Sequence, residues 1–327
     1  MENYSSNNIA TPKVCIILVN YLGWQDTIEC MQSLLNLTYT NWQAIIVDNN
    51  SPNNSYNQLK DWANTSLSSE SSSFLTEDEL QLKEESYESK FLFIKANKNQ
   101  GFAAGNNIAL KYLLQLREFE YIWLLNNDTT VAPDSLSAYI SSASKKSNVG
   151  IWGAKLLYYH KPDIIQAIGG SFNKKLFTTK HIGENLSDAK VSEFQFEEID
   201  YVVGASMLVS KKFVEHVGLM DENYFLYFEE LDWATRASKH GYKLSYVDSC
   251  RIYHKEGQSI GSNSNGNEKS DLADYHGIKS KIYFIRKHYP EYKLRLYILV
   301  LTSVILRLAR LKFKRAAVIF KLLYQTV

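Results

Sequence analysis

Short apolar runs that alternate with segments of helical periodicity constrain the fold of this chain most strongly. Each run is rich in β-branched or aromatic residues and is short for a buried helix. The runs are Val14–Val19, Trp42–Val47, Phe91–Ile94 and Tyr121–Leu125. Helical spacing is found between them, at Asp26–Leu37 and Gly105–Leu116. This alternation predicts an α/β fold, with a mostly parallel central sheet flanked by helices.

Polar residues follow three of these predicted strands, at the points where the strands end. They are Asn20 and Tyr21, then Asp48, and then Asn126, Asn127 and Asp128. In open α/β sheets, ligands bind beyond the carboxyl ends of the strands. We therefore expect these side chains to share one binding site.

An acidic cluster lies further along the chain, directly after an aromatic run. Glu229, Glu230 and Asp232 fall within four residues. Carboxylates this close repel one another, and their burial is costly unless a cation or a hydrogen bond compensates. One of them can serve as a general base on a hydroxyl group. The alternative is the first turn of a helix, where the macrodipole favours acidic residues. It accounts for Asp232 more readily than for the two glutamates.

The second half of the chain is expected to hold short strands and turns up to about residue 200. Beyond that point, strands are predicted at Asp200–Val209 and Tyr242–Val247, and helices at Lys211–Val217 and Leu231–His240. Residues 257–270 are rich in Gly, Ser and Asn and are expected to form a loop.

Gly101 and Gly105 lie in a turn that leads into a predicted helix. Glycine allows the backbone to approach a ligand closely, and a helix N-terminus favours anions. The spacing fits neither the dinucleotide fingerprint nor the P-loop. An NAD-dependent enzyme is therefore the least expected function.

Asp128 and His254 are the candidate ligands of a divalent cation. Mg²⁺ or Mn²⁺ is usually held by one or two carboxylates together with substrate phosphates, so a diphosphate would supply the remaining ligands. A histidine considered alone is more often a structural or surface residue, and this alternative stays open for His254.

Composition limits the class of protein. The chain has 327 residues, 45% of them hydrophobic, and a net charge of +1, which gives no indication of nucleic-acid binding. Three scattered cysteines favour a reducing compartment. We expect a disordered polar tail at 1–12, a catalytic domain at 13–270 and a helical region at 271–327. Within the catalytic domain, 65–90 is predicted to be an acidic, Ser-rich, mobile insertion with a short helix near residues 78–85.

The C-terminal region combines apolar and basic residues. Residues 292–327 contain no acidic residue, and the apolar run Tyr297–Leu306 is short for a membrane span. Amphipathic helices with unpaired basic residues suit an anionic membrane surface. The alternative is a helical subdomain packed on the core. The expected location is the cytoplasm, peripheral on the inner face of the cell membrane.

Taken in order, these segments resemble family 2 glycosyltransferases with the GT-A fold, in particular the bacterial rhamnosyltransferase-like branch. The similarity covers roughly residues 13–262 and rests on Val14–Tyr21, Val47–Ser51, Asn99–Asn106, Leu125–Asp128, Phe225–Arg236 and His254. Two positions depart from the family pattern. The DxD element reads Asn-Asn-Asp, and Glu230 stands where the family has its catalytic aspartate.

The resemblance implies an inverting transfer of a sugar from a nucleoside diphosphate donor to a hydroxyl of a glycan acceptor, which is expected to be polyprenyl-linked, in bacterial surface polysaccharide synthesis. The first candidate donor is dTDP-rhamnose. UDP-hexose or galactofuranose transfer is the alternative, followed by a nucleotide-sugar hydrolase or pyrophosphorylase, or a non-catalytic binding protein.

The resemblance also implies roles for individual residues. Glu230 would be the catalytic base, and Asp128 and His254 would hold Mg²⁺ or Mn²⁺. The acceptor side would be formed or supported by Glu229, Asp232, Arg236, Trp233 and Gly204. The donor would be bound by Asn20, Tyr21, Asp48, Asn99, Gly101, Gly105, Asn106, Asn126 and Asn127.

Overall fold

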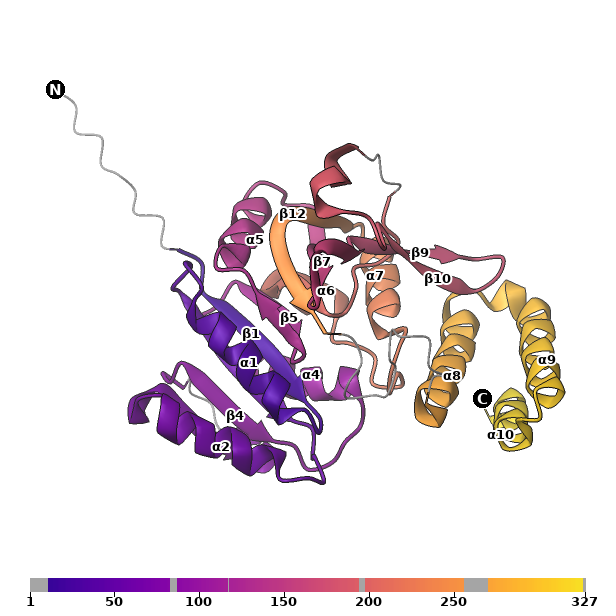
Figure 1. Ribbon diagram of the computed structural model, residues 1–327, viewed down its shortest axis with the longest axis horizontal. Helices are drawn as coiled ribbons and strands as arrows, with labels where there is room; N and C mark the ends of the chain where they lie inside the picture. The colour runs from indigo at the N-terminus through magenta and orange to yellow at the C-terminus, as the bar shows by residue number, and fades with distance from the viewer. Residues whose placement is uncertain (1–10, 83–86, 117, 194–197, 256–269, 326–327) are drawn as a thin grey trace.

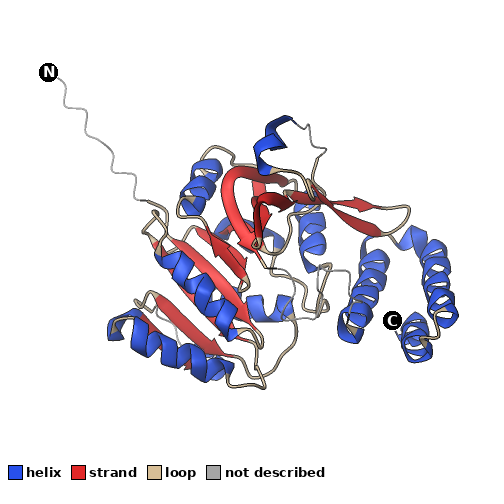
Figure 2. Cartoon of the chain, in the orientation of Figure 1, coloured by secondary structure: helices blue, strands red, loops and turns tan. Residues whose placement is uncertain are grey.

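A computed structural model describes residues 11–82, 87–116, 118–193, 198–255 and 270–325. Within these residues a ten-stranded, mostly parallel sheet forms the centre, and helices cover both of its faces (Figures 1 and 2). The expected tail falls mainly on residues 1–10, which lie outside the described residues, as does most of the predicted loop at 257–270.

The first half of the chain alternates as its sequence predicts. Parallel pairing joins β4, β2, β1 and β5, so their carboxyl ends lie at one edge of the sheet. The elements are β1 (Val14–Asn20), α1 (Trp24–Leu35), β2 (Trp42–Asp48), α2 (Ser55–Ser66), β3 (Ser72–Thr76), α3 (Glu77–Gln81), β4 (Phe91–Lys95), α4 (Phe102–Gln115) and β5 (Tyr121–Asn126).

Burial on both faces explains why the strands read as continuous apolar runs. In β1, Val14, Ile16 and Leu18 pack into one hydrophobic cluster with α1 and α2, whereas Cys15 and Ile17 pack into a second cluster with α4. Successive side chains of a strand point to opposite faces, so both sets are withdrawn from water.

The prediction of a mobile insertion at 65–90 is wrong for most of the segment. Ser72–Thr76 forms the edge strand β3, which pairs in parallel with β4. The Phe74 ring stacks on the Phe93 ring with 5.0 Å between centroids. Helix α3 begins with a capping box between Thr76 and Glu79. Apolar contacts and a helix cap thus stabilise regular structure in a segment whose acidic composition is typical of a loop.

The second half completes the sheet and adds a hairpin. The predicted strand at Asp200–Val209 is shorter than expected, because the chain joins the sheet only at Ser206. The elements are β6 (Thr129–Val131), α5 (Ser135–Ala143), β7 (Val149–Tyr158), β8 (Lys161–Ala167), β9 (Gly169–Asn173), β10 (Thr178–Ile182), β11 (Ser206–Ser210), α6 (Lys211–Val217), α7 (Glu229–Lys239) and β12 (Lys243–His254).

Three helices form a C-terminal lobe beside the β9–β10 hairpin (Figure 1). They are α8 (Asp271–His288), α9 (Lys293–Ala309) and α10 (Phe313–Gln325). Their inner faces pack with Phe172 and Phe228 of the body in one hydrophobic cluster. In the described part of the chain, no helix combines the length and the apolar character that crossing a membrane requires.

The expectation that the C-terminal basic residues lack acidic partners is wrong for two of them. Arg307 makes a two-point ion pair with Asp274, with NH2 2.5 Å from Oδ1, and Arg315 pairs with Asp271. Both aspartates belong to α8, outside the acid-free segment that the sequence analysis considered. Residues 292–327 therefore have an excess of positive charge in the sequence, and ion pairs with α8 neutralise part of it.

Candidate active site

The polar residues that end β1 and β2 form one hydrogen-bonded group. Asn20 and Asp48 are paired in register, and Nδ2 of Asn20 donates to Oδ1 of Asp48 at 2.7 Å. The Asp48 carboxylate also accepts from the backbone and hydroxyl of Ser51. Thr27 Oγ1 donates to Asn20, and Nδ2 of Asn127 donates to Thr27. Buried carboxylate and amide groups thus tie two strand ends to the start of α1. Tyr21 follows directly and is half-buried.

Asn126 and Asn127 have different environments. The Asn127 amide is turned towards α1, where it supports the group just described. The side-chain oxygen of Asn126 is buried and has no hydrogen-bond partner among the described residues. A buried acceptor without a partner is costly unless a ligand or water satisfies it. Asn126 is therefore the better candidate for a donor contact.

Asp128 and His254 come together, as the metal hypothesis requires. Oδ1 of Asp128 lies 3.2 Å from Nε2 of His254, and both residues are nearly buried. Antiparallel pairing of β6 with β12 sets this distance. Nδ1 of His254 lies 2.9 Å from Oε1 of Gln166, a residue that is 1% exposed.

These residues fit a divalent cation that a ligand helps to bind. An amide oxygen only accepts, so in this arrangement His254 donates from Nδ1 to Gln166, and its Nε2 faces Asp128. Such an outer partner is the usual way in which a metal-binding histidine is oriented. The described residues contain no group of three or more His, Cys, Asp or Glu side chains that would hold a metal. A carboxylate and an imidazole alone leave most coordination positions to a diphosphate and water.

The expectation that Gly101 and Gly105 leave room for a ligand is wrong, because protein atoms occupy the space. A Cβ at Gly101, which has φ +95°, would lie 2.1 Å from the backbone oxygen of Phe225. A Cβ at Gly105 would lie 2.8 Å from Cγ1 of Val19. The first glycine lets the 219–228 loop approach, and the second lets α4 pack on β1.

The neighbouring asparagines hold this turn in place. The side-chain oxygen of Asn99 accepts from the Gly101 amide at 2.9 Å, and Asn106 donates to the carbonyl of Phe102. Asn107 was not among the predicted site residues. It exchanges hydrogen bonds with the Met220 backbone and also donates to Glu222. The sequence signal was its position beside Asn106, at the buried start of α4.

Glu229 and Glu230 occupy the first turn of α7, directly after a strained turn. Tyr227 and Phe228 adopt left-handed backbone conformations, with φ values of 66° and 71°. Aromatic residues rarely adopt this conformation, and such strain is concentrated at functional sites. One oxygen of each glutamate is buried without a hydrogen-bond partner among the described residues. Gly204 lies alongside, because a Cβ there would be 3.9 Å from Cβ of Glu230.

The two glutamates differ in their protonation. Burial raises the pKa of Glu230 to about 7, although the backbone amides of Glu230 and Leu231 act in the opposite direction. Burial, together with the charge of Glu230, raises the pKa of Glu229 well above its ordinary value. The neutral form of Glu229 is therefore favoured, while Glu230 can exchange a proton near neutral pH. A pKa near the working pH is the property that a general base needs.

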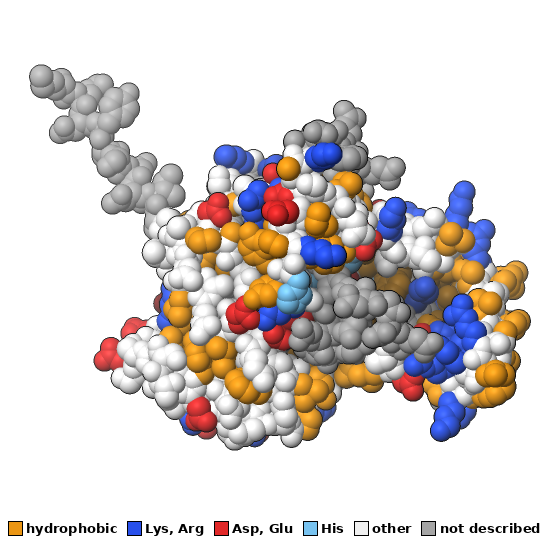
Figure 3. All heavy atoms as spheres, viewed as in Figure 1, with side chains coloured by type: hydrophobic (Ala, Val, Ile, Leu, Met, Phe, Trp, Pro, Cys, Tyr) orange, Lys and Arg blue, Asp and Glu red, His pale blue; other side chains and the backbone are white. Residues whose placement is uncertain are grey.

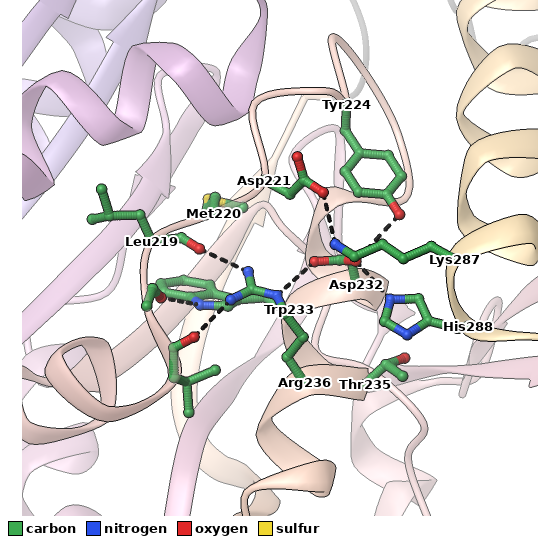
Figure 4. A network of polar contacts seen from close by, with 12 residues as sticks. Leu219, Met220, Asp221, Tyr224, Asp232, Trp233, Thr235, Arg236, Lys287 and His288 are labelled. Atoms are coloured by element: carbon green, nitrogen blue, oxygen red, sulfur yellow. Dashed lines mark hydrogen bonds and ion pairs between the residues drawn. The ribbon is translucent and has the colours of Figure 1, made fainter. Parts of the chain in front are cut away.

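Asp232, Arg236 and Trp233 make polar contacts with the neighbouring loop and with α8. The buried Asp232 carboxylate binds Nε of Arg236, Nζ of Lys287 and Nε2 of His288, each at 2.7 Å (Figure 4). Burial alone would raise its pKa, but these three hydrogen bonds lower it well below the ordinary range. Arg236 also donates to the carbonyls of Val217 and Leu219, and Trp233 donates to that of Gly218.

Three residues of this region were missed by sequence reasoning. Gln166 lies in β8, and its sequence context gives no indication of a site. Lys287 and His288 end α8, where basic residues are typical of any helix C-terminus. Only their contacts distinguish them.

Comparisons with known proteins agree with this geometry. The family model "Glycosyl transferase family 2" matches residues 14–218, which is more than half of the chain. A low-salt glycan biosynthesis hexosyltransferase, Agl10 of Haloferax volcanii, is 21% identical over 74% of this chain and 66% of its own length. An N-acetylglucosaminyl-diphospho-decaprenol L-rhamnosyltransferase of Mycobacterium tuberculosis is 25% identical over 48% of this chain and 52% of its own length.

A third relative, the rhamnosyltransferase WbbL of Escherichia coli, is 28% identical over 47% of this chain and 60% of its own length. The chain thus spans between about half and two thirds of the length of these curated relatives.

Two solved structures share the GT-A fold. GalNAc-T7 with UDP, GalNAc and Mn²⁺ superposes with a TM-score of 0.61 at 13% identity, over 89% of this chain and 50% of that structure. The mannosyltransferase PcManGT of Pyrobaculum calidifontis with GDP-Man and Mn²⁺ gives 0.54 at 13% identity, over 95% and 74%. With the family model matched across the strands that carry Asn20, Asp48 and Asp128, the chain belongs to glycosyl transferase family 2.

Proposed function

We propose that this protein is an inverting glycosyltransferase that moves a sugar from a nucleoside diphosphate donor to a hydroxyl group of a glycan acceptor. The observation that carries the proposal is the position of Glu230. It begins a helix beside a strained turn, with a carboxylate whose pKa lies near 7. A non-catalytic binding protein would need neither feature.

In the proposed reaction, the Glu230 carboxylate accepts the proton of the acceptor hydroxyl. The acceptor oxygen forms a bond to the anomeric carbon on the face opposite the diphosphate, and the bond between that carbon and the diphosphate oxygen breaks. One displacement inverts the anomeric configuration. The raised pKa of Glu229 favours its neutral form, which adds no second negative charge beside the base.

Asp128 and His254, with Gln166 behind the imidazole, would hold Mg²⁺ or Mn²⁺. When bound, the cation supplies positive charge to the leaving diphosphate. The side-chain oxygen of Asn126 would accept a hydrogen bond from a hydroxyl of the donor, because it is buried and lacks a protein partner among the described residues. Asn20, Tyr21 and Asp48 would lie towards the nucleoside.

The preferred donor is dTDP-rhamnose, in view of the rhamnosyltransferases among the relatives. UDP-hexose or UDP-galactofuranose is the second candidate, since a hexosyltransferase is also among them. Thermal stabilisation by dTDP, UDP and GDP, with and without Mn²⁺, would select the nucleotide. Transfer from the matching sugar donor to a synthetic polyprenyl-diphosphate glycan, followed by mass spectrometry, would then test the reaction. Release of free sugar with no acceptor product would favour a hydrolase.

The C-terminal lobe carries the proposed membrane surface. Its residues Leu294, Ile298, Leu301, Ile305 and Leu308 recur at helical spacing along α9 and are between 41% and 76% exposed. The opposite face of α9 is buried inside the C-terminal lobe through Leu296, Val300 and Val304, in a cluster shared with α8 and α10. One helix thus has two apolar faces, and only one of them is covered within the described chain.

The basic residues around this exposed face indicate the kind of partner that it would bind. Basic and apolar side chains gather together on this lobe (Figure 3). Exposed basic residues, among them Lys293, Arg295, Arg310, Lys314 and Lys321, flank the apolar stripe. An apolar stripe edged by basic residues fits an anionic lipid surface. Burial of the apolar side chains and attraction of the basic side chains to the lipid headgroups would both contribute to binding. A lipid-linked acceptor would be presented at the same surface.

Flotation with vesicles of phosphatidylglycerol and phosphatidylcholine would test this surface. We expect wild-type protein to float, and the Ile298→Ser, Ile305→Ser double variant to remain at the bottom. The matched control is Leu82→Ser, Leu176→Ser, which removes two equally exposed leucines from the body. Equal flotation of both variants would contradict the assignment. If sedimentation instead showed a dimer formed through α9, the partner of the exposed apolar face would be a second copy of this chain and not lipid.

A further inference from the structure

Helix α8 contacts the loop before the catalytic helix along most of its length. The His276 ring stacks on Phe225 with 4.3 Å between centroids. Ser280 donates to the carbonyl of Leu226 at 2.8 Å. The Phe284 ring lies 5.5 Å from that of Phe228. These contacts support the left-handed turn at 227–228 from one side.

The other side of the same loop contacts α4. The Phe102 amide, at the start of α4, donates to the Phe225 carbonyl at 3.0 Å. Asn107 and Lys111 of α4 both bind Glu222 at 2.9 Å. The loop at 219–228 is therefore held between α4 and α8, and Glu230 follows directly after it.

The firmest link between α8 and the catalytic helix is ionic. Nζ of Lys287 lies 2.7 Å from Asp232 and 2.6 Å from Asp221, and Nε2 of His288 lies 2.7 Å from Asp232 (Figure 4). Arg236 binds the same carboxylate from within α7 and joins the helix to the carbonyls of Val217 and Leu219, whereas Lys287 and His288 reach Asp232 from α8. Asp232 lies two residues after Glu230, in the same helical turn. A shift of α7 at Asp232 would therefore move the base.

We propose that Lys287 and His288 are positioning residues of the active site, which fix the start of α7 through Asp232 and thereby hold Glu230 at the acceptor. This inference rests on the proposed function, because it assigns the support of the same base. The C-terminal lobe then completes the catalytic site in addition to carrying the membrane surface. Asp274 and Arg307, and Asp271 and Arg315, join α8 to α9 and α10.

The variant Lys287→Met tests the inference, because it keeps the length of the side chain but removes its charge. We expect kcat to fall by between about tenfold and 10²-fold, the effect of a misplaced catalytic group. The KM for the donor should stay within about twofold, since donor contacts are retained. Lys287→Arg should recover most of the activity. Should the Met variant not fold, Lys287→Gln, which keeps one donor, replaces it.

Val304→Ala is the matched control. It removes buried volume from the same lobe without touching Asp232. Assayed well below the melting temperature, it should keep its kcat. An equal loss of kcat in Val304→Ala, or a wild-type kcat in Lys287→Met, would overturn the positioning role.

Hydrogen exchange provides a measurement that needs no substrate. Lys287→Met should speed exchange of the backbone amides at 224–232 and leave those of β1 and β2 unchanged. Unchanged exchange at 224–232 would contradict the positioning role. If exchange changes as expected but wild-type protein transfers no sugar from any donor, the proposed function fails, while the support of the start of α7 by Lys287 stands.

Discussion

Oδ1 of Asp128 faces Nε2 of His254 at 3.2 Å, although the two residues are 126 positions apart in the sequence. Asp128 precedes β6 and His254 ends β12, and the antiparallel pairing of these strands sets the distance. The backbone amide of Lys255 also donates to the carbonyl of Asp128 at 3.0 Å. A carboxylate and an imidazole are thus held together by the sheet rather than by a flexible loop.

Removing the amide behind His254 should weaken metal binding. Gln166→Leu takes away the acceptor that orients the ring, and loss of such a partner typically costs 10–100-fold in metal affinity, so we expect about that decrease. Titration of Mn²⁺ in the presence of the best-bound nucleoside diphosphate, followed by electron paramagnetic resonance, would measure it. Gln43→Leu is the control, because Gln43 is also buried but bonds to Tyr87 and Ser89 far from the site. Similar losses in both variants would assign the effect to general destabilisation.

Replacing each of the two glutamates at the start of α7 by glutamine should show which of them is the base. Glu230→Gln removes the proposed base and should lower kcat by about 10²- to 10⁴-fold, the usual contribution of general base catalysis, while donor binding is kept. Glu229→Gln replaces a carboxyl group whose raised pKa favours the neutral form, and its kcat should stay within about tenfold of wild type. Comparable activity in the two variants would show that the base has been assigned wrongly.

The reaction should depend on pH through Glu230. The base acts when deprotonated and burial raises its pKa to about 7, so kcat should rise with pH up to about 7 and then level off. A pH–rate profile measured with saturating substrates would show this limb, and the residual activity of Glu230→Gln should lack it. A profile that is already flat at pH 5 would contradict the assignment.

The free energy of unfolding should fall, whereas kcat rises, as the pH increases from about 4.5 to about 7. The folded state binds the Glu230 proton more tightly than the unfolded chain, whose ordinary pKa is 4.5, so this group contributes most at low pH. The contribution should be lost as pH rises from about 4.5 to about 7. Asp232 acts differently, because its lowered pKa contributes stability above 3.8 that is lost only in stronger acid. Urea unfolding of wild type and of the Glu229→Gln, Glu230→Gln double variant at several pH values would measure the first window.

The close approach at Gly101 should make this glycine more sensitive than others with positive φ. Gly101→Ala adds a Cβ in a left-handed conformation and drives it into the Phe225 carbonyl. Gly241→Ala has a similar φ of +79° but nothing within 4 Å of the added carbon, so it should cost only the conformational term of about 1–2 kcal/mol. Chemical denaturation should show a clearly larger loss for Gly101→Ala. Equal losses of stability would mean that the 219–228 loop can move away from the added Cβ without a measurable cost in free energy.

Much of the site could be located from local sequence. Apolar runs that end in Asn20, Asp48 and Asp128 predict strand ends, and parallel strands bring their ends to one edge. The acidic pair Glu229–Glu230 was found because carboxylates after an aromatic run are costly without a use. The edge strand Ser72–Thr76 was missed, because pairing with β4 and stacking on Phe93 outweigh a composition that is typical of loops.

The sequence by itself determined the alternation of strands and helices, the polar strand ends and the acidic helix start, because each depends on neighbouring residues and on burial patterns of period two or 3.6. Only the tertiary structure decided which groups meet. It placed Gln166 behind His254, gave Arg307 and Arg315 acidic partners, and turned Asp232 towards Lys287 and His288. Contacts between elements far apart in the chain leave no local pattern, and they set both the partners and the pKa of a buried charge.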